Sequence, residues 1–234
     1  MIVDAVRGWL QRALWDVVPR DHRESPGQLR RRQVVTLAFV VLGGAVLAVS
    51  LRIEPGSAWF YPATLGLALV WTVGAFASGP LHLGRVVHPS GHHVRPVAVP
   101  VLLGLALAGL FVVGGLVVRE IDVLDAYVRS VVAYADEGLV VVLVLVTLVN
   151  GIAEELFFRG AAYAAVTRHP VPVTTVAYAV ATLATGNVML GFAAILLGAV
   201  VGLQRRATGG ILAPILTHVT WSVSMLFALP ALFG

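Results

Sequence analysis

Cysteine and lysine are absent from the 234-residue chain. Without cysteine there is no disulfide, no thiolate metal site and no cysteine nucleophile. Charge is also scarce, because Asp, Glu and Arg together make up 12% of the residues, whereas soluble domains carry roughly a quarter. These absences exclude an ordinary soluble domain and any thiol-based enzyme.

Apolar residues take the place of the missing charges. They form 59% of the chain and give a mean hydropathy of +0.91. Since a bilayer core of ~30 Å needs about 20 apolar residues per helix, the sequence predicts an all-α, polytopic transmembrane helical bundle of about seven spans. The expected spans are 33–51, 59–78, 98–118, 138–158, 171–186, 188–204 and 210–232. The first begins too far along the chain for a cleavable signal peptide.

The arginines predict how the bundle lies in the membrane. They precede the first span and recur in the loops of that same predicted side, at Arg30-Arg31-Arg32, Arg85, Arg95, Arg168 and Arg205-Arg206. Cytoplasmic loops are rich in basic residues, so we expect a cytoplasmic N-terminus and an extracytoplasmic C-terminus. With all-arginine usage, this fits the plasma (inner) membrane of a bacterium. The net charge of +4 therefore indicates contact with membrane lipid and not with nucleic acid.

Four histidines occur in the predicted loop 79–97, at His82, His88, His92 and His93. Imidazole is a common metal ligand. No carboxylate is near, so we expect a basic cytoplasmic loop and not a metal site.

Two glutamates and an arginine follow the uncharged apolar run 138–149. Ionisable groups at the apolar depth of a membrane tend to be functional. On a helix, Glu155 and Arg159 share a face, which predicts an internal ion pair. Glu154 lies about 100° round the helix, on the face of Asn150. We expect Glu154 to face a polar cavity; the alternative is that all three charges lie at a helix end among lipid headgroups.

The last predicted span carries His218 and, four residues later, Ser222. A lone histidine on an apolar helix is commonly a hydrogen-bonded packing residue. Because a second polar constellation exists in the same membrane, we hypothesise that His218 and Glu154 share a cavity. A carboxylate and an imidazole facing one cavity can hold zinc or another divalent metal, or activate a water.

These motifs resemble those of the CPBP family, which comprises the CAAX prenyl proteases of the Rce type and the bacterial bacteriocin-processing (Abi) proteins. The resemblance rests on Glu154-Glu155-xxx-Arg159 and on the downstream run Arg205-Arg-Ala-Thr-Gly-Gly-Ile-Leu-Ala-Pro-Ile-Leu-Thr-His218, and it covers residues 138–232. It implies an intramembrane endopeptidase in which Glu154 activates a water.

Two positions depart from the pattern of the family. Its second motif, Phe-xxx-His, best matches Tyr178-Ala-Val-Ala-Thr182, and its third, His-xxx-Asn, matches His218-xxx-Ser222. Weaker metal binding is expected, because a hydroxyl is a poor zinc ligand. The expected pocket-lining residues are Asn150, Tyr178, Thr182, Asn187 and Ser222.

The resemblance therefore implies a membrane endopeptidase that acts on a peptide or protein substrate. The expected divisions are a basic amphipathic cytoplasmic segment (1–32), N-terminal transmembrane helices (33–118), an extracytoplasmic amphipathic connector (119–137) and a CPBP-like catalytic core (138–234). A second hypothesis, motivated by the two departures, is a catalytically impaired family member that serves as a membrane scaffold or immunity-type peptide-binding protein. A small transporter or channel is a third.

Overall fold

The computed structural model describes residues 7–18, 24–50, 52–87, 93–136 and 138–234. The elements in chain order are η1 (Gln11–Trp15), α2 (Pro26–Ser50), α3 (Phe60–Ser78), β1 (Val86–Val87), β2 (His93–Val94), α4 (Ala98–Val118), α5 (Asp122–Asp136), α6 (Val140–Glu155), η2 (Leu156–Ala162), α7 (Tyr163–Ala165), α8 (Pro170–Leu183), α9 (Val188–Thr208) and α10 (Leu212–Phe233), where η marks a π-helix. β1 and β2 form a short antiparallel ladder.

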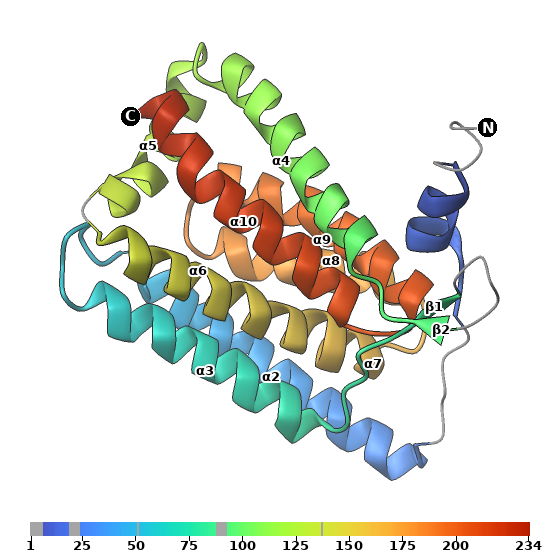
Figure 1. Ribbon diagram of the computed structural model, residues 1–234. Coiled ribbons are helices and arrows are strands. Elements are labelled where there is room, and N and C mark those ends of the chain that lie inside the picture. The colour runs from blue at the N-terminus through green and yellow to red at the C-terminus, as the bar shows by residue number, and fades with distance from the viewer. Residues whose placement is uncertain (1–6, 19–23, 51, 88–92, 137) are drawn as a thin grey trace.

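The helices form an elongated bundle in which chain neighbours pair (Figure 1). α2 packs on α3, and α8 packs on α9. α6 lies between α3 and α10, and α4 covers the other side of α10. α6 and α10, which carry the two predicted motifs, are therefore direct neighbours.

Six helical segments among the described residues are long and apolar enough to cross a membrane. They are α2, α3, α4, the continuous segment α6–η2–α7, α9 and α10. The fifth predicted span is α8, an apolar helix of 14 residues, which at 1.5 Å per residue is about 21 Å long. It ends at a turn where Gly186 has a φ of 82°. The protein is an all-α integral membrane bundle.

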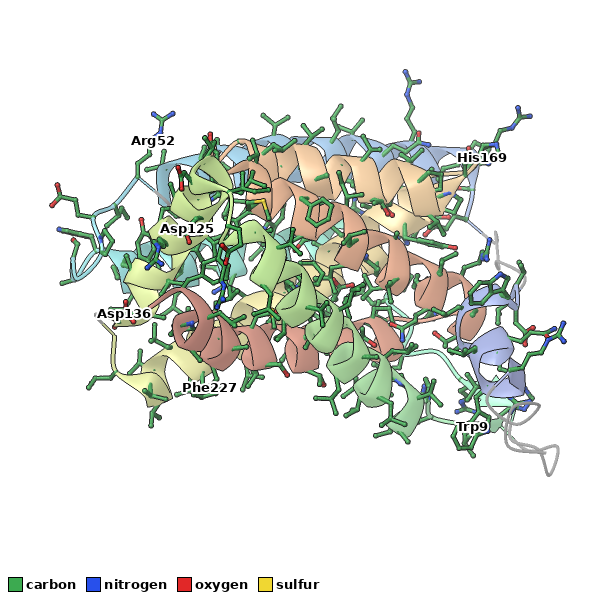
Figure 2. All side chains as sticks on the ribbon, turned by 90° about the horizontal axis from the view of Figure 1, so that it is seen from above. Trp9, Arg52, Asp125, Asp136, His169 and Phe227 are labelled. Carbon is green, nitrogen blue, oxygen red and sulfur yellow. The ribbon has the colours of Figure 1, made fainter. Side chains whose placement is uncertain are left out.

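The flanks of the bundle are apolar, as a lipid-facing surface requires. Large exposed aliphatic and aromatic side chains on them include Leu69, Phe76, Val113, Val141 and Val180. Figure 2 shows Arg52, Asp125 and Asp136 at one end of the bundle and Trp9 and His169 at the other. Polar side chains at the two ends and apolar ones between them match the profile of a bilayer.

One end of the bundle is closed by α5, the helix expected in the amphipathic connector. Its buried Val128 and Val132 pack against Phe233 of α10. Arg129 donates a hydrogen bond to the Phe233 carbonyl, and the Tyr134 hydroxyl donates to the Ile53 carbonyl at 2.6 Å. α5 therefore lies across the helix ends rather than beside the spans.

The opposite end gathers the arginine-rich segments. The Arg85 amide donates to the Thr208 carbonyl at 2.9 Å, and the Ile211 amide donates to the His82 carbonyl at 2.9 Å. The start of the predicted histidine loop is thus tied to the α9–α10 turn. His88 and His92 lie outside the described residues, as does Val6 of the predicted amphipathic segment. That this end faces the cytoplasm stays a prediction.

Small residues bring α2 and α3 close together beside the site. Gly43 of α2 faces Trp71 of α3, and a Cβ at Gly43 would overlap the indole ring. Trp71 is 1% exposed and packs on Phe157 and Phe158 at centroid distances of 4.7 and 5.0 Å. The α2–α3 contact therefore supports the helix that carries the predicted motif.

Gly43→Ala should lower the free energy of unfolding by about 1–3 kcal/mol, because the added methyl group overpacks the indole. Denaturation in detergent, followed by tryptophan fluorescence, measures the change. Gly66→Ala is the matched control, since nothing lies within 4 Å of a Cβ there. Equal stability of the two variants would contradict the close approach of α2 and α3.

Candidate active site

The paired glutamates lie where α6 changes into a π-helix. α6 ends at Glu155, and η2 (Leu156–Ala162) follows without a break and contains Arg159. Short π-helical turns inside α-helices are frequent at functional sites. The sequence predicted an ordinary α-helix through this stretch, which is wrong after Glu155. The wider turn alters which side chains of η2 face the bundle interior.

Glu155 and Arg159 form the buried ion pair that their spacing predicts. Arg159 Nη1 donates to Glu155 Oε1 at 3.0 Å, and both side chains are fully buried. The Arg159 guanidinium also lies over the Tyr178 ring, 4.9 Å from its centroid. A charge taken out of water must be paired and hydrogen-bonded, so Glu155 and Arg159 each stabilise the charge of the other.

His218 of α10 reaches the same carboxylate. Its Nδ1 lies 2.8 Å from Glu155 Oε1, and the residue is 4% exposed. An ionised carboxylate only accepts hydrogen bonds, and Glu155 is ionised opposite Arg159. Nδ1 therefore carries a proton and donates to Glu155. This fixes the ring orientation and turns Nε2 away from Glu155.

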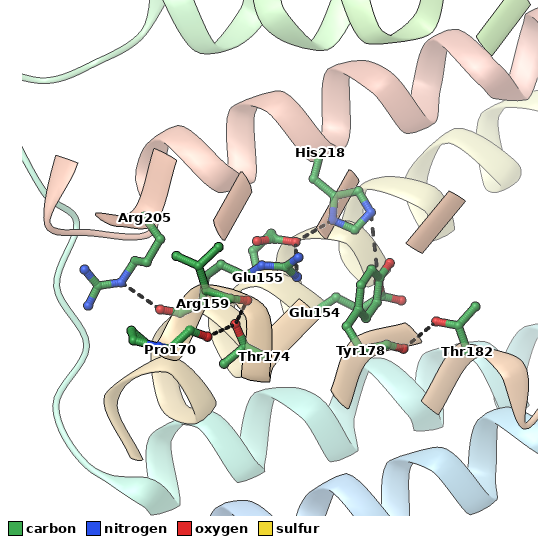
Figure 3. A network of polar contacts seen from close by, with 10 residues as sticks. Glu154, Glu155, Arg159, Pro170, Thr174, Tyr178, Thr182, Arg205 and His218 are labelled. Carbon is green, nitrogen blue, oxygen red and sulfur yellow. Dashed lines mark hydrogen bonds and ion pairs between the residues drawn. The ribbon is translucent and has the colours of Figure 1, made fainter. Parts of the chain in front are cut away.

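Nε2 of His218 faces Glu154, as Figure 3 shows. Nε2 and Glu154 Oε2 are 3.9 Å apart. The Tyr178 hydroxyl of α8 donates to the same Oε2 at 2.6 Å. The Glu154 side chain keeps 17% exposure, in contrast to Glu155. The two glutamates thus differ: Glu155 is a buried anchor, and Glu154 is the more accessible carboxylate.

The other predicted lining residues are engaged elsewhere. Thr182 lies one turn beyond Tyr178, and its hydroxyl donates to the Tyr178 carbonyl at 2.9 Å. Asn150 donates to the Val146 carbonyl of its own helix at 3.0 Å. Ser222 lies one turn beyond His218 and makes no hydrogen bond to these side chains among the described residues. The structure brings none of the three into the hydrogen bonds around Glu154.

The expectation that Asn187 supplies a pocket amide is wrong. Its Oδ1 accepts from the Met189 and Leu190 amides at 3.0 and 3.1 Å, so it caps α9. Its Nδ2 donates to the Tyr127 carbonyl and to Ser130 of α5. An asparagine directly before a helix is a common N-cap. The sequence interpretation missed that Asn187 immediately precedes the apolar run that forms α9.

Few side chains at this site could act as metal ligands. Catalytic zinc sites have three protein ligands, whereas Glu154 and His218 supply two. No cluster of three or more His, Asp or Glu side chains suited to a metal occurs in the described parts of the chain. The side chains present therefore do not fit a catalytic zinc ion.

The segment that holds this site is similar to a known protein family. A family model described as "Type II CAAX prenyl endopeptidase Rce1-like" matches residues 136–224. This match assigns residues 136–224 to the CPBP/CAAX protease family. The CAAX protease segment includes Glu154, Glu155, Arg159 and His218, and it leaves α2, α3 and α4 outside the match. No curated protein matches, and no solved structure matches.

Arg159→Met should destabilise the CAAX protease segment by about 3–5 kcal/mol, because it leaves the Glu155 carboxylate buried without its cation. An SDS titration of the folded protein measures the loss. Glu155→Gln combined with Arg159→Met should recover part of it, since no uncompensated charge remains. Arg119→Met is the exposed comparator, because the side chains of Arg119 and Glu120 in its ion pair are 45% and 70% exposed. A loss no larger than that of Arg119→Met would contradict the buried pair.

Proposed function

We propose that the protein is an intramembrane endopeptidase that hydrolyses a peptide bond with a water activated by Glu154. The observation that carries the proposal is the approach of Glu154 Oε2 to His218 Nε2 at 3.9 Å. A carboxylate and an imidazole this close together can act on one water and one scissile carbonyl. The family match supports the same chemistry.

Charge balance suggests the protonation state of the site. Arg159 is cationic, and Glu154 and Glu155 are carboxylates, so the cluster is neutral when His218 carries a second proton. Buried charges are stable only when they are paired. We therefore take His218 as an imidazolium whose Nδ1–H is donated to Glu155 and whose Nε2–H is free to meet a substrate carbonyl.

The reaction then proceeds with all protons accounted for. The water oxygen attacks the scissile carbonyl carbon, and Glu154 takes one proton from the water. His218 Nε2–H donates to the carbonyl oxygen as it becomes an oxyanion. The intermediate collapses, the C–N bond breaks, and Glu154 passes its proton to the leaving amine, while the second proton of the water stays on the product carboxylic acid. Glu155 and Arg159 hold His218 in place throughout.

The family description supports a proposal for the substrate class. We propose a peptide or protein that ends in a prenylated CAAX sequence, presented to the site from the membrane. The prenyl group would lie in lipid or between helices, so membrane lipid is the second partner. An inner-membrane location, a bacterial origin and a cytoplasmic N-terminus remain parts of this proposal.

The scaffold alternative has one observation in its favour. The Thr182 hydroxyl is bonded to its own helix, so the residue in the family's histidine position contributes no polar group to Glu154. A protein without activity that still bound the peptide would fit that role.

Glu154→Gln should abolish cleavage of a farnesylated CAAX peptide, because the amide cannot accept the proton of the water. Product formation by the purified protein in detergent, followed by mass spectrometry, measures this. Glu120→Gln is the matched control at an exposed position and should cleave like the parent. Retained cleavage by Glu154→Gln would contradict the proposal. A parent protein that binds the peptide without cleaving it would favour the scaffold role.

A metal chelator should leave the activity within about twofold of the untreated protein, because two protein donors fall short of the three of catalytic zinc sites. The purified protein should likewise carry zinc well below one equivalent by elemental analysis. Loss of cleavage on chelation, with recovery on adding zinc, would show that a metal takes part.

A further inference from the structure

We infer that Tyr178 positions the general base: its hydroxyl anchors one oxygen of Glu154 and leaves the other for the water. This inference rests on the proposed function and deepens it. The Tyr178 hydroxyl donates to Glu154 Oε2 at 2.6 Å, a short distance typical of a hydroxyl bonded to a carboxylate. It is the only hydrogen bond to the Glu154 carboxylate among the described residues.

The two oxygens of Glu154 therefore have different surroundings. Oε2 is bonded to Tyr178 and lies nearest to His218 Nε2. Oε1 accepts no hydrogen bond from the described residues and is absent from the buried, unpartnered atoms. It is thus the accessible oxygen, and we assign it the proton of the attacking water.

The phenol is held firmly enough to act as an anchor. Tyr178 is 8% exposed. Phe158 packs on its ring at a centroid distance of 4.9 Å, and the Arg159 guanidinium lies over the same ring at 4.9 Å. Both contacts come from η2, so the π-helical turn places the ring while α6 places the carboxylate.

Tyr178 also takes over a role that the family motif gives to another residue of α8. The family motif predicts that position 182 faces the site, but the Thr182 hydroxyl is bonded to the Tyr178 carbonyl. Residues 178 and 182 are one turn apart on one face of α8. The hydroxyl at position 178 thus supplies the contact to Glu154 that the threonine at position 182 does not.

The test compares Tyr178→Phe, Thr182→His and the double variant in the full-length protein with the farnesylated peptide. Tyr178→Phe keeps the ring packing and removes only the hydroxyl. We expect kcat to fall about 10²-fold, as for a misplaced catalytic group, with KM within about twofold. Tyr127→Phe, a change on α5, is the matched control and should match the parent.

Recovery of activity in the double variant distinguishes a positioning role of Tyr178 from a packing role. An imidazole at position 182 offers α8 a second way to contact Glu154. Thr182→His should therefore raise kcat of Tyr178→Phe about tenfold or more. A packing role for Tyr178 predicts no rescue, because the imidazole would not restore a lost ring contact.

The outcomes are distinct. Cleavage by the parent with an unchanged kcat in Tyr178→Phe overturns this inference and leaves the proposed function standing. No cleavage by the parent removes both. If Tyr178→Phe fails to fold, infrared spectra of ring-labelled tyrosine in the folded parent and Glu154→Gln decide: a shift of one tyrosine C–O band supports the contact, and identical spectra overturn it.

Discussion

Glu155 is the constraint on which the rest of the site depends. One of its oxygens accepts from both Arg159 Nη1 and His218 Nδ1, at a depth where water does not reach the side chain. A carboxylate there is stable only while both donors stay in place. Glu155 therefore locks the end of α6, the π-helical turn and α10 into one arrangement, and it sets the direction in which His218 points.

The neighbouring glutamate, Glu154, has the opposite environment, although the two residues are adjacent in the chain. The helical rotation of about 100° per residue takes Glu154 to the accessible side of α6, where Tyr178 and His218 Nε2 meet it. One side chain is thus specialised for structure and the other for chemistry. This division explains why a membrane helix keeps two adjacent carboxylates at the end of an uncharged run.

The sequence predicted the features that depend on spacing and hydropathy. Apolar runs located the six long helices, and the short length of the 171–186 run anticipated α8. The interval between Glu155 and Arg159 predicted their ion pair, which is present. These predictions succeed because a residue's neighbours one turn away are fixed by helix geometry alone.

Features set by contacts between distant segments could not be predicted in this way. No pattern in Leu156-Phe157-Phe158 predicts a π-helix, and the packing of both phenylalanines on Trp71 is a contact with a distant helix that the sequence does not reveal. Asn187 was assigned to the site because it follows a span, yet its side chain accepts hydrogen bonds from the first amides of α9. The contact of Tyr178 with Glu154 joins residues 24 positions apart, and it forms because α8 packs against η2, which directly follows α6.

The orientation of His218 by Glu155 is the central claim, and ¹⁵N NMR of histidine-labelled protein in detergent tests it most directly. Comparison with His218→Gln identifies the signals of the ring. The account predicts a protonated, hydrogen-bonded Nδ1 whose signal changes in Glu155→Gln. An unprotonated Nδ1, or a ring spectrum that Glu155→Gln leaves unchanged, would contradict it.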